Sequence, residues 1–310
     1  MADIKLGLIG AGRWGRNYIR TIQRMEGVRL ARLASRNPES AQLAGEGCKI
    51  SADWLQVAQA ADIQGVIIAT PPGTHAEIAK AAVDVGNPVL IEKPLCLSLP
   101  EAVELRALAK ALGTFAMVGH THLFAPAYQA LKELGGALGP LKSIDAEAGN
   151  WGPFRKDTPV LWDWGAHDAA LCLDLVGLMP VDTSARLVER RETGEGLGET
   201  LSLHFEFPEG VTADIRLSNL MSAKARRFTA RFEAARLAYD DLAPAKLTIL
   251  PPSDDSPAHA IDVPLTPPLD LVVREFTDSI ALGRDDLASL DLGVAVVAVL
   301  AECAERLAHA

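Results

Sequence analysis

Several groups of residues in this chain have types and spacings that could support chemistry. In the first, Gly10, Gly12 and Gly15 follow an apolar run of buried-strand type and precede a helical pattern. In such a strand–turn–helix unit, the first glycine allows a tight turn. The second lets the backbone approach a pyrophosphate, and the third lets helix and strand pack closely. Because a helix N-terminus also offers N–H groups to phosphates, the spacing predicts a dinucleotide-binding turn that includes Arg13 and Trp14.

The end of the second expected strand bears on the choice between NAD and NADP. Ser35 and Arg36 stand where an acidic residue would hydrogen-bond the ribose 2′-hydroxyl of NAD. An arginine at this place can accommodate a 2′-phosphate instead. These residues therefore favour NADP, with NAD as the alternative if Arg36 only stacks on the adenine.

Lys93 is a candidate for the reaction itself. The sequence Glu92-Lys93-Pro94 follows an apolar strand pattern, so we expect Lys93 at the carboxyl edge of a sheet, where open α/β sheets bind ligands. Pro94 favours an extended backbone at Lys93. A lysine there could hydrogen-bond a substrate hydroxyl and stabilise a developing alkoxide during hydride transfer. The alternative is a solvated lysine that pairs with Glu92.

Asp163 and His167 form a second candidate pair. Their i, i+4 spacing places both on one face of a helix that we expect to begin near residues 159–162. The positive end of that helix favours a neutral His167, which can accept a proton while Asp163 orients it. Oxidation of a hydroxyl needs such a base. A capping Asp163 beside a structural His167 is the alternative, and Asp168 could equally be the acid that faces a ligand.

Further polar residues stand near other expected strand ends. Thr70 and Pro71 follow one strand, and His75 opens the next helix, where it could face the cofactor or be structural. His120 follows another strand and could form a polar wall of the substrate pocket. His120 and His122 alternate as metal ligands can, but no nearby carboxylate or thiol completes a set, so no metal is expected.

The elements that must position these residues show two successive patterns. Over about the first 120 residues, strand and helix patterns alternate, which predicts a parallel sheet with helices on both faces. The expected strands are residues 4–9, 28–34, 65–69, 88–91 and 115–118. The expected helices are residues 16–25, 38–44, 53–60, 74–85 and 100–112. This is the pattern of a doubly wound Rossmann domain.

The pattern changes from about residue 120. Helices are expected at 127–134, 162–176, 270–282 and 292–308, and strands at 141–148, 185–190, 201–207, 212–217, 228–232 and 247–250. Several strands in succession predict an open, mostly antiparallel sheet. We therefore expect an α/β protein with a Rossmann dinucleotide-binding domain over residues 1–119. An α+β substrate-binding and oligomerisation domain is expected over residues 120–310.

Composition excludes several classes of protein. The 310 residues carry a formal net charge of −10 with a pI near 5.2, which argues against nucleic acid as a partner. No apolar run reaches the ~18 residues of a membrane helix, and no signal-peptide pattern is present. The four cysteines are scattered, which favours reduced thiols and a cytoplasmic location.

Together these pieces resemble the glucose–fructose oxidoreductase/inositol dehydrogenase (Gfo/Idh/MocA) family over nearly the whole chain. The resemblance rests, in chain order, on residues 10–15, 69–75, 92–94, 118–120 and 163–167. The family pairs an N-terminal Rossmann domain with a C-terminal α+β domain whose open sheet often builds dimers or tetramers. Its members mostly oxidise or reduce sugars, inositols, sugar nucleotides and related polyols with NAD or NADP. The resemblance therefore implies an NAD(P)-dependent oxidoreductase with a carbohydrate-like substrate, assembled as a homo-oligomer.

The resemblance also implies roles for single residues. The family's catalytic lysine corresponds to Lys93. The Asp and His of inositol-dehydrogenase-like members correspond to Asp163 and His167. Similarity to a branch that includes nucleotide-sugar dehydrogenases makes Arg155 a contact for an anionic substrate group.

The chain departs from the family pattern at three places. Many members carry an acid three residues after the His, where this chain has Ala170, and Asp168 could replace it. Many have a glycine run where this chain has residues 160–162, and Ser35 replaces the acid often found at the second strand's end. These departures concern the choice of substrate and cofactor and leave the expected fold unchanged.

Two other functions are compatible with the same residues. One is a hydrolase or lyase of the same family that retains its cofactor and cleaves a glycosidic bond without net redox change. The other is a non-catalytic NAD(P)-binding regulator. The joint presence of Lys93, Asp163 and His167 favours an enzyme over a regulator.

Overall fold

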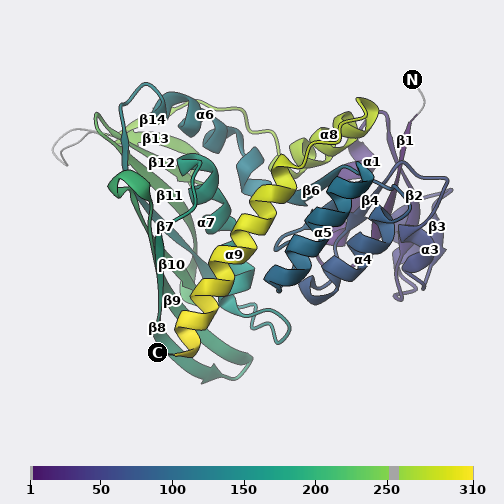
Figure 1. Ribbon diagram of the computed structural model, residues 1–310, viewed down its shortest axis with the longest axis horizontal. Coiled ribbons are helices and arrows are strands. Elements are labelled where there is room, and N and C mark those ends of the chain that lie inside the picture. Colours follow the sequence, from purple (N-terminus) through teal and green to yellow (C-terminus); the bar gives the residue numbers. More distant parts are fainter. Residues whose placement is uncertain (1–2, 251–257, 310) are drawn as a thin grey trace. The chain divides into compact units, whose positions relative to one another are not determined.

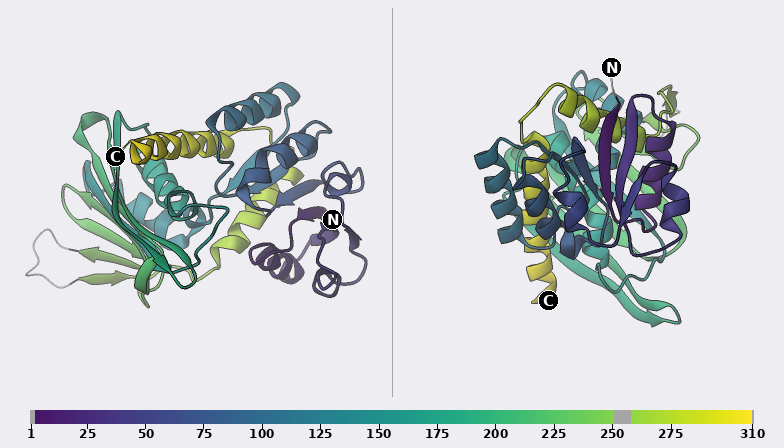
Figure 2. Two further views of the ribbon diagram at one scale, coloured as in Figure 1. Left: turned by 90° about the horizontal axis from the view of Figure 1, so that it is seen from below. Right: turned by 90° about the vertical axis from the view of Figure 1, so that its right-hand side faces the viewer.

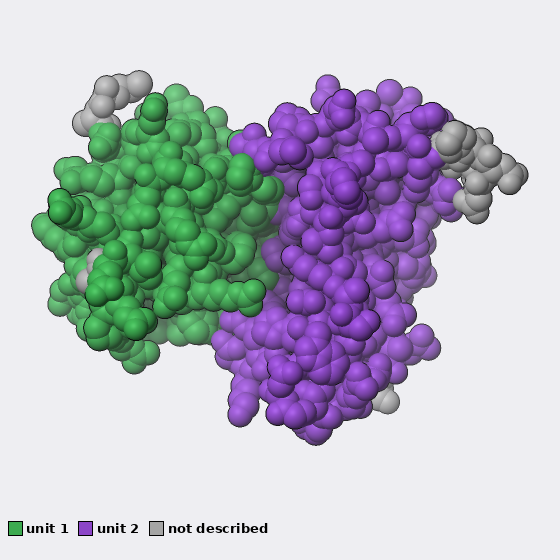
Figure 3. Space-filling model, turned by 180° about the vertical axis from the view of Figure 1, so that it is seen from behind, with its two compact units in different colours: residues 1–121, 267–297 green, residues 122–266, 298–310 purple. Residues whose placement is uncertain are grey.

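A computed structural model describes residues 3–250 and 258–309 of the chain. These residues form two compact units, coloured separately in Figure 3. The first comprises residues 1–121 and 267–297, and the second residues 122–266 and 298–310. The boundary expected after residue 119 stays a prediction. In the structure, the first compact unit continues to Thr121 and also includes residues 267–297.

The first unit is built on a six-stranded sheet in the order β3-β2-β1-β4-β5-β6 (Figure 1). All neighbouring pairs are parallel. The strands are β1 (Ile4–Ile9), β2 (Val28–Ala34), β3 (Lys49–Ser51), β4 (Gly65–Ile68), β5 (Val89–Glu92) and β6 (Ala116–Gly119). The last three are buried along their whole length, as expected for parallel strands that are covered on both faces.

Two glycines show that helices pack on both faces of this sheet. A Cβ added at Gly7 would lie 2.9 Å from Val57 on one face. Gly65 pairs with Leu6, whose side chain must point to the other face, and its added Cβ would lie 2.9 Å from Phe276. The helices of this unit are α1 (Gly15–Arg24), α2 (Ser40–Ala44), α3 (Leu55–Ala58), α4 (His75–Val83), α5 (Leu99–Leu112), α8 (Pro268–Ala281) and residues 288–297 of α9 (Ala288–Ala308).

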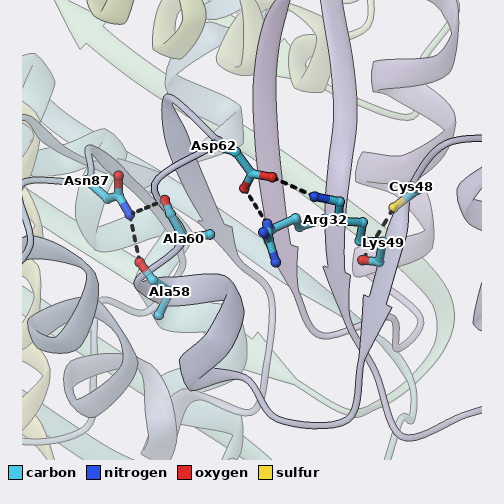
Figure 4. Close-up of polar contacts among 7 residues, drawn as sticks. All are labelled: Arg32, Cys48, Lys49, Ala58, Ala60, Asp62 and Asn87. Atoms are coloured by element: carbon cyan, nitrogen blue, oxygen red, sulfur yellow. Dashed lines mark hydrogen bonds and ion pairs between the residues drawn. The ribbon is translucent and has the colours of Figure 1, made fainter.

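Charged side chains meet at the short edge strand β3, which pairs with β2. Asp62 lies between Arg32 of β2 and Lys49 of β3, and Lys49 Nζ is 2.9 Å from its Oδ2 (Figure 4). Both cations lower the pKa of the Asp62 carboxyl. Nearby, the Asn87 amide donates to the carbonyl oxygen of Ala58, the last residue of α3, at 2.9 Å. The Lys49–Asp62 contact is thus an exposed ion pair at the edge of the sheet.

The second unit is built on an eight-stranded sheet in the order β14-β13-β12-β11-β7-β10-β9-β8. Its neighbouring strands are antiparallel except β7 and β10, which run parallel. The strands are β7 (Leu141–Trp151), β8 (Asp182–Thr193), β9 (Gly196–Glu206), β10 (Thr212–Ser218), β11 (Leu220–Phe232), β12 (Arg236–Asp240), β13 (Leu247–Leu250) and β14 (His259–Ile261).

Helices α6 (Pro126–Gly135) and α7 (Val160–Val176) pack on one face of this sheet (Figure 2). Helix α7 contacts β7, β9 and β10. Gly165 permits a close approach, because a Cβ there would lie 3.1 Å from Leu217 of β10. The other face is polar, with exposed residues that include Asp145, Glu147, Asp214, Arg216 and Arg227.

The expected fold class is confirmed: a doubly wound parallel sheet is followed by a mostly antiparallel sheet. Most expected elements occur within a few residues of their expected ends. The expectation missed β3, β12 and β14, which are three to five residues long and show too few alternations to be recognised. None of the helices in the described part of the chain has the length and apolar character needed to cross a bilayer.

Candidate active site

The turn between β1 and α1 has the geometry that its three glycines predict. Gly10 has a φ of +98°, and a Cβ there would lie 2.6 Å from the carbonyl oxygen of Ala69. A Cβ at Gly15 would lie 1.9 Å from the carbonyl oxygen of Gly10. By contrast, a Cβ at Gly12 would meet no described atom within 4 Å. Gly10 and Gly15 are thus required by the turn itself, whereas Gly12 leaves open space beside the backbone.

This open space fits the pyrophosphate of a dinucleotide. Helix α1 begins at Gly15, and none of the residues in its first turn, all of them described, is acidic. The positive end of the helix dipole is therefore available to an anion. Arg13 and Trp14 are exposed beside Gly12 in the turn. The residues of this turn therefore fit a bound dinucleotide, the cofactor that the glycine spacing predicts.

The end of β2 presents a hydroxyl pair and an arginine. The Oγ atoms of Ser35 and Ser40 lie 2.7 Å apart, and Ser35 Oγ also accepts from the Asn37 N–H at 3.2 Å. Ser40 is buried, whereas Arg36 is exposed. The Ser35 side chain therefore interacts with the start of α2, and Arg36 is the cation that faces solvent at this strand end.

Glu92, at the end of β5, is a buried carboxylate in the first unit. Tyr18 donates its hydroxyl to Glu92 Oε1 at 2.6 Å, and the Lys93 N–H donates to Oε2 at 3.2 Å. Burial raises the pKa of Glu92 to about 7, although the hydrogen bonds from Tyr18 and Trp14 act in the opposite direction. The sequence reasoning missed Tyr18. The available signal was its position on α1, one turn after the glycine motif.

His75 connects the Thr70 loop to the segment that carries Lys93. Its Nδ1 lies 2.9 Å from the carbonyl oxygen of Pro94, and its Nε2 lies 2.8 Å from the carbonyl oxygen of Thr70. Thr74 Oγ1 also contacts the carbonyl oxygen of Pro71 at 2.8 Å. Burial lowers the pKa of His75, so the ring is neutral at physiological pH. His75 thus holds two predicted site segments together.

His120 is fully buried at the end of β6. Within the described part of the chain, neither of its ring nitrogens has a hydrogen-bond partner. Burial lowers the pKa of His120 to about 3, and the nearby charge of Lys93 contributes in the same direction. A buried polar ring without a protein partner fits the prediction that His120 contacts a ligand, which stays a prediction.

In the second unit, α7 places Asp163 in its first turn and His167 one turn later. Both side chains are partly exposed. The Arg155 guanidinium lies 3.4 Å from Asp163 Oδ1 and 3.3 Å from Asp157 Oδ1. The structure therefore brings Arg155, predicted to contact substrate, next to the acid predicted to orient His167.

His122 lies beside His167, and Tyr239 in turn contacts His122; the sequence had assigned neither of them to catalysis. The His122 and His167 rings are nearly perpendicular, with centroids 4.8 Å apart. His122 Nδ1 lies 2.9 Å from the hydroxyl of Tyr239 on β12. Burial strongly raises the pKa of Tyr239, so its hydroxyl stays protonated and can donate to His122. Among the described residues, no group of His, Cys, Asp and Glu could hold a metal ion.

Asp168 is placed differently from its neighbour His167. Its carboxylate is buried, and Oδ2 lies 3.4 Å from Arg226 of β11, which is also buried. The guanidinium of Arg226 in turn lies 5.2 Å from the ring centroid of Trp164. A buried ion pair of this kind fixes the orientation of α7 on the sheet. Ala170 is also buried.

Comparison with known proteins gives the same family for both parts of the chain. The family described as “Oxidoreductase family, NAD-binding Rossmann fold” matches residues 4–120. The family described as “GFO/IDH/MocA C-terminal domain” matches residues 128–238. Together the two matches extend from the first strand of the first sheet into β12 of the second.

Two curated relatives carry names of specific enzymes. Inositol 2-dehydrogenase 4 of Saccharopolyspora erythraea is 35% identical over 44% of this chain and 43% of its own length. UDP-N-acetylglucosamine 3-dehydrogenase of Acidithiobacillus ferrooxidans is 31% identical over 60% of this chain and 58% of its own length. The chain thus spans about half the length of these curated relatives.

Solved structures are similar over the full chain. A protein from Magnetospirillum magnetotacticum MS-1 is 45% identical, with a TM-score of 0.92 over 97% of this chain and 100% of that chain. The Acidithiobacillus ferrooxidans enzyme GnnA is 26% identical, with a TM-score of 0.85 over 99% of this chain and 98% of that chain. From these matches and the two family matches, the chain belongs to the Gfo/Idh/MocA oxidoreductase family.

Proposed function

We propose that this protein is an NAD(P)-dependent oxidoreductase that transfers a hydride between nicotinamide and a carbon of a sugar, polyol or sugar derivative. The observation that carries the proposal is the open glycine turn at Gly12, together with Lys93 at the carboxyl edge of the same sheet. Dinucleotide folds bind their ligand at this edge. Relatives named as inositol and UDP-N-acetylglucosamine dehydrogenases support the substrate class.

The proposed cofactor contacts lie in four segments of the first unit. The backbone at Gly12 and the start of α1 hold the pyrophosphate, and the Arg36 side chain holds a 2′-phosphate, which makes NADP the preferred cofactor over NAD. The full set is Gly10, Gly12, Arg13, Trp14, Gly15, Ser35, Arg36, Thr70, Pro71, His75, Glu92 and Lys93, in which the buried Glu92 acts through Trp14. When bound, the cofactor supplies the acceptor or donor of the hydride.

Lys93 is proposed to hold the oxygen of the reacting carbon. Its ammonium donates a hydrogen bond to the substrate hydroxyl or carbonyl and stabilises negative charge as it develops on that oxygen. The contact between the Lys93 N–H and Glu92 Oε2 fixes the backbone from which this side chain extends. His75 fixes the next residue, because its ring contacts the Pro94 carbonyl.

His167 is proposed to move the proton. In the oxidative direction it accepts the proton of the substrate hydroxyl, and in the reductive direction it returns that proton. Asp163 lies one turn earlier on α7 and orients the imidazole. His122 packs against the His167 ring and limits its rotation, while the Tyr239 hydroxyl fixes His122.

Beyond these residues, His120 and Arg155 are the proposed substrate contacts, and Asp168 is proposed to support the site. His120 offers buried ring nitrogens, and Arg155 offers a partly exposed cation for an anionic substrate group. Because Asp168 is buried against Arg226, we propose that it acts through the placement of α7.

Assembly and location are part of the same proposal. We propose a homodimer or homotetramer that uses the uncovered face of the eight-stranded sheet. The opposite charges on that face, such as Glu147 and Arg216 with their side chains 3.9 Å apart, would make such an interface polar. We also propose a cytoplasmic location, which agrees with the free state of Cys48, Cys96, Cys172 and Cys303 in the structure.

A fluorescence titration with NADPH and NADH tests the cofactor proposal. Trp14 is 39% exposed in the glycine turn, so its emission should be quenched on binding. We expect tighter binding of NADPH, and we expect Arg36→Ala to weaken NADPH binding about tenfold while NADH binding stays within twofold. The matched control is Arg29→Ala, which removes an exposed arginine on β2, the strand that precedes Arg36. Equal loss of both cofactors in Arg36→Ala would refute the preference for NADP.

A panel of substrates tests the reaction. The purified protein is incubated with NADP or NAD and inositols, free sugars or nucleotide sugars, and reduction of the cofactor is followed at its near-ultraviolet absorbance. Product formed without any net change of the cofactor would replace the oxidoreductase proposal by a hydrolytic one.

A further inference from the structure

The buried carboxylate of Glu92 has a charge of the same sign as the ligand expected beside it. Glu92 is 5% exposed and Tyr18 is fully buried. Gly119 makes room for this pair, because a Cβ there would lie 3.2 Å from both Glu92 Oε1 and the Tyr18 hydroxyl. Glu92 also receives a hydrogen bond from the side chain of Trp14, a residue of the glycine turn. Glu92 is therefore connected to the proposed pyrophosphate site through a single side chain.

We propose that Glu92 and Tyr18 form a proton-holding pair, in which Glu92 takes up one proton when the anionic dinucleotide binds. This inference rests on the proposed binding of NAD(P) in the first unit. The proton comes from water and resides on the Glu92 carboxyl group, while Tyr18 keeps its own proton and continues to donate to Oε1. Both residues are positioning residues, because they act on the cofactor through Trp14 and on the substrate through the backbone of Lys93.

The physical reason is repulsion between like charges in a region with little water. A nearby negative charge disfavours the ionised form of a carboxyl group. With a pKa of about 7 before binding, Glu92 exchanges its proton readily near neutral pH. Above that value the carboxylate is ionised and opposes the ligand, and below it the group is already neutral. Affinity for the dinucleotide should therefore fall as the pH rises through 7.

Other charged groups near this pair do not produce the same effect. Lys93 is the nearby cation, and its charge lowers the pKa of Glu92. Burial lowers the pKa values of His75 and His120, so both rings are already neutral above pH 7. Tyr18 is held protonated, because burial raises its pKa well above the usual range. Glu92 is the group of this cluster whose ionisation changes near neutral pH.

The test measures the binding of NADH from pH 6 to pH 8.5, together with proton uptake in weakly buffered solution containing a pH indicator. NADH is the probe because NADPH carries a phosphate that titrates near pH 6. We expect the Kd of the wild-type protein to rise roughly fivefold to tenfold over this range, as for a pKa that rises by about one unit on binding. Proton uptake should be largest just above pH 7.

Two variants assign the proton. Glu92→Gln keeps the shape of the side chain and should abolish both the uptake and the change of Kd with pH. Tyr18→Phe removes a donor that stabilises the carboxylate, so the midpoint of the pH dependence should move upward, which a purely structural defect would not produce. The controls are Glu104→Gln, an exposed carboxylate on α5, and Tyr128→Phe, which also loses a hydrogen bond to a carboxylate.

The outcomes separate this inference from the cofactor proposal. Absence of proton uptake by the wild-type protein, or equal uptake by Glu92→Gln, would overturn the proton-holding pair while NADH binding stands. Failure of NADH and NADPH to bind at any pH would overturn both the inference and the cofactor proposal. A shifted midpoint in Tyr18→Phe, without a shift in Tyr128→Phe, would support the pair.

Discussion

In the first unit most candidate residues stand at the ends of parallel strands, whereas in the second Asp163, His167 and Asp168 stand on one helix. The turn at Gly12 and the segment at Lys93 are fixed mainly by backbone geometry and by contacts to backbone atoms, such as that of His75 with the Pro94 carbonyl. His167 instead packs against a side chain from a separate element, His122, which Tyr239 of β12 contacts in turn.

This difference indicates that the two units contribute to different parts of the proposed function. A site made from backbone can bind the constant part of a ligand, because every dinucleotide presents the same pyrophosphate. A site made from side chains on a helix and a sheet can be changed one residue at a time, as the choice of substrate requires. Variants of the glycine turn should therefore change cofactor binding most, whereas variants of Lys93 and of the site residues on α7 should change turnover most.

The largest expected effect is on turnover, from His167. Replacement of His167 by Gln removes the proposed base and should lower kcat/KM by about 10³-fold, within the range typical of general base catalysis. Cofactor affinity should stay within threefold. The measurement is steady-state kinetics on the substrate found in the panel, combined with a cofactor titration. His204→Gln, a partly exposed histidine on β9, is the control, and similar losses in both variants would contradict the proposed role.

A smaller effect is expected on cofactor binding, from Gly12. A valine at Gly12 would extend into open space, so Gly12→Val should leave the Tm within a few degrees while it raises the Kd of the cofactor by about 10²-fold. Gly15→Ala should instead destabilise the fold by about 1–3 kcal/mol, because its Cβ would overlap the Gly10 carbonyl. Thermal melting and fluorescence titration separate the two variants. Unchanged cofactor affinity in Gly12→Val would contradict the fit of a pyrophosphate there.

The smallest effect is expected from Tyr239, which acts through His122. Tyr239→Phe removes one hydrogen bond, worth about 1 kcal/mol, and should lower kcat about fivefold if that bond holds His122 against His167. Tyr128→Phe removes a comparable buried hydrogen bond from α6 and should leave kcat within twofold. If both variants reduce kcat equally, His122 has no specific positioning role.

The sequence predicted the first unit's candidate residues more completely than those of the second. The three glycines of the turn and the strand before Lys93 are local signals, and the structure confirms the elements that carry them. Tyr18 was missed because its position on α1 after the glycine turn does not show which strand end its side chain will contact. In the second unit, the i, i+4 spacing predicted that Asp163 and His167 share a helix, and both lie on α7.

The partners of α7 could not be predicted by spacing. Tyr239 lies on β12, a five-residue strand that the alternation did not reveal, and it is 117 residues from His122 in sequence. Asp168 was expected to face a ligand, but its burial depends on Arg226, which reaches it from β11. Pairings of this kind depend on the register of a sheet, which one sequence does not specify.

A direct test of the central proposal is a single-turnover experiment on Lys93→Met. The variant is loaded with cofactor, mixed with the substrate from the panel, and followed by the absorbance of the reduced nicotinamide. We expect cofactor affinity within threefold of the wild-type value and a rate of hydride transfer lowered by about 10²–10³-fold, with Lys110→Met, an exposed lysine on α5, behaving as wild type. An unchanged rate of hydride transfer in Lys93→Met would contradict the account, as would a loss explained entirely by weaker cofactor binding.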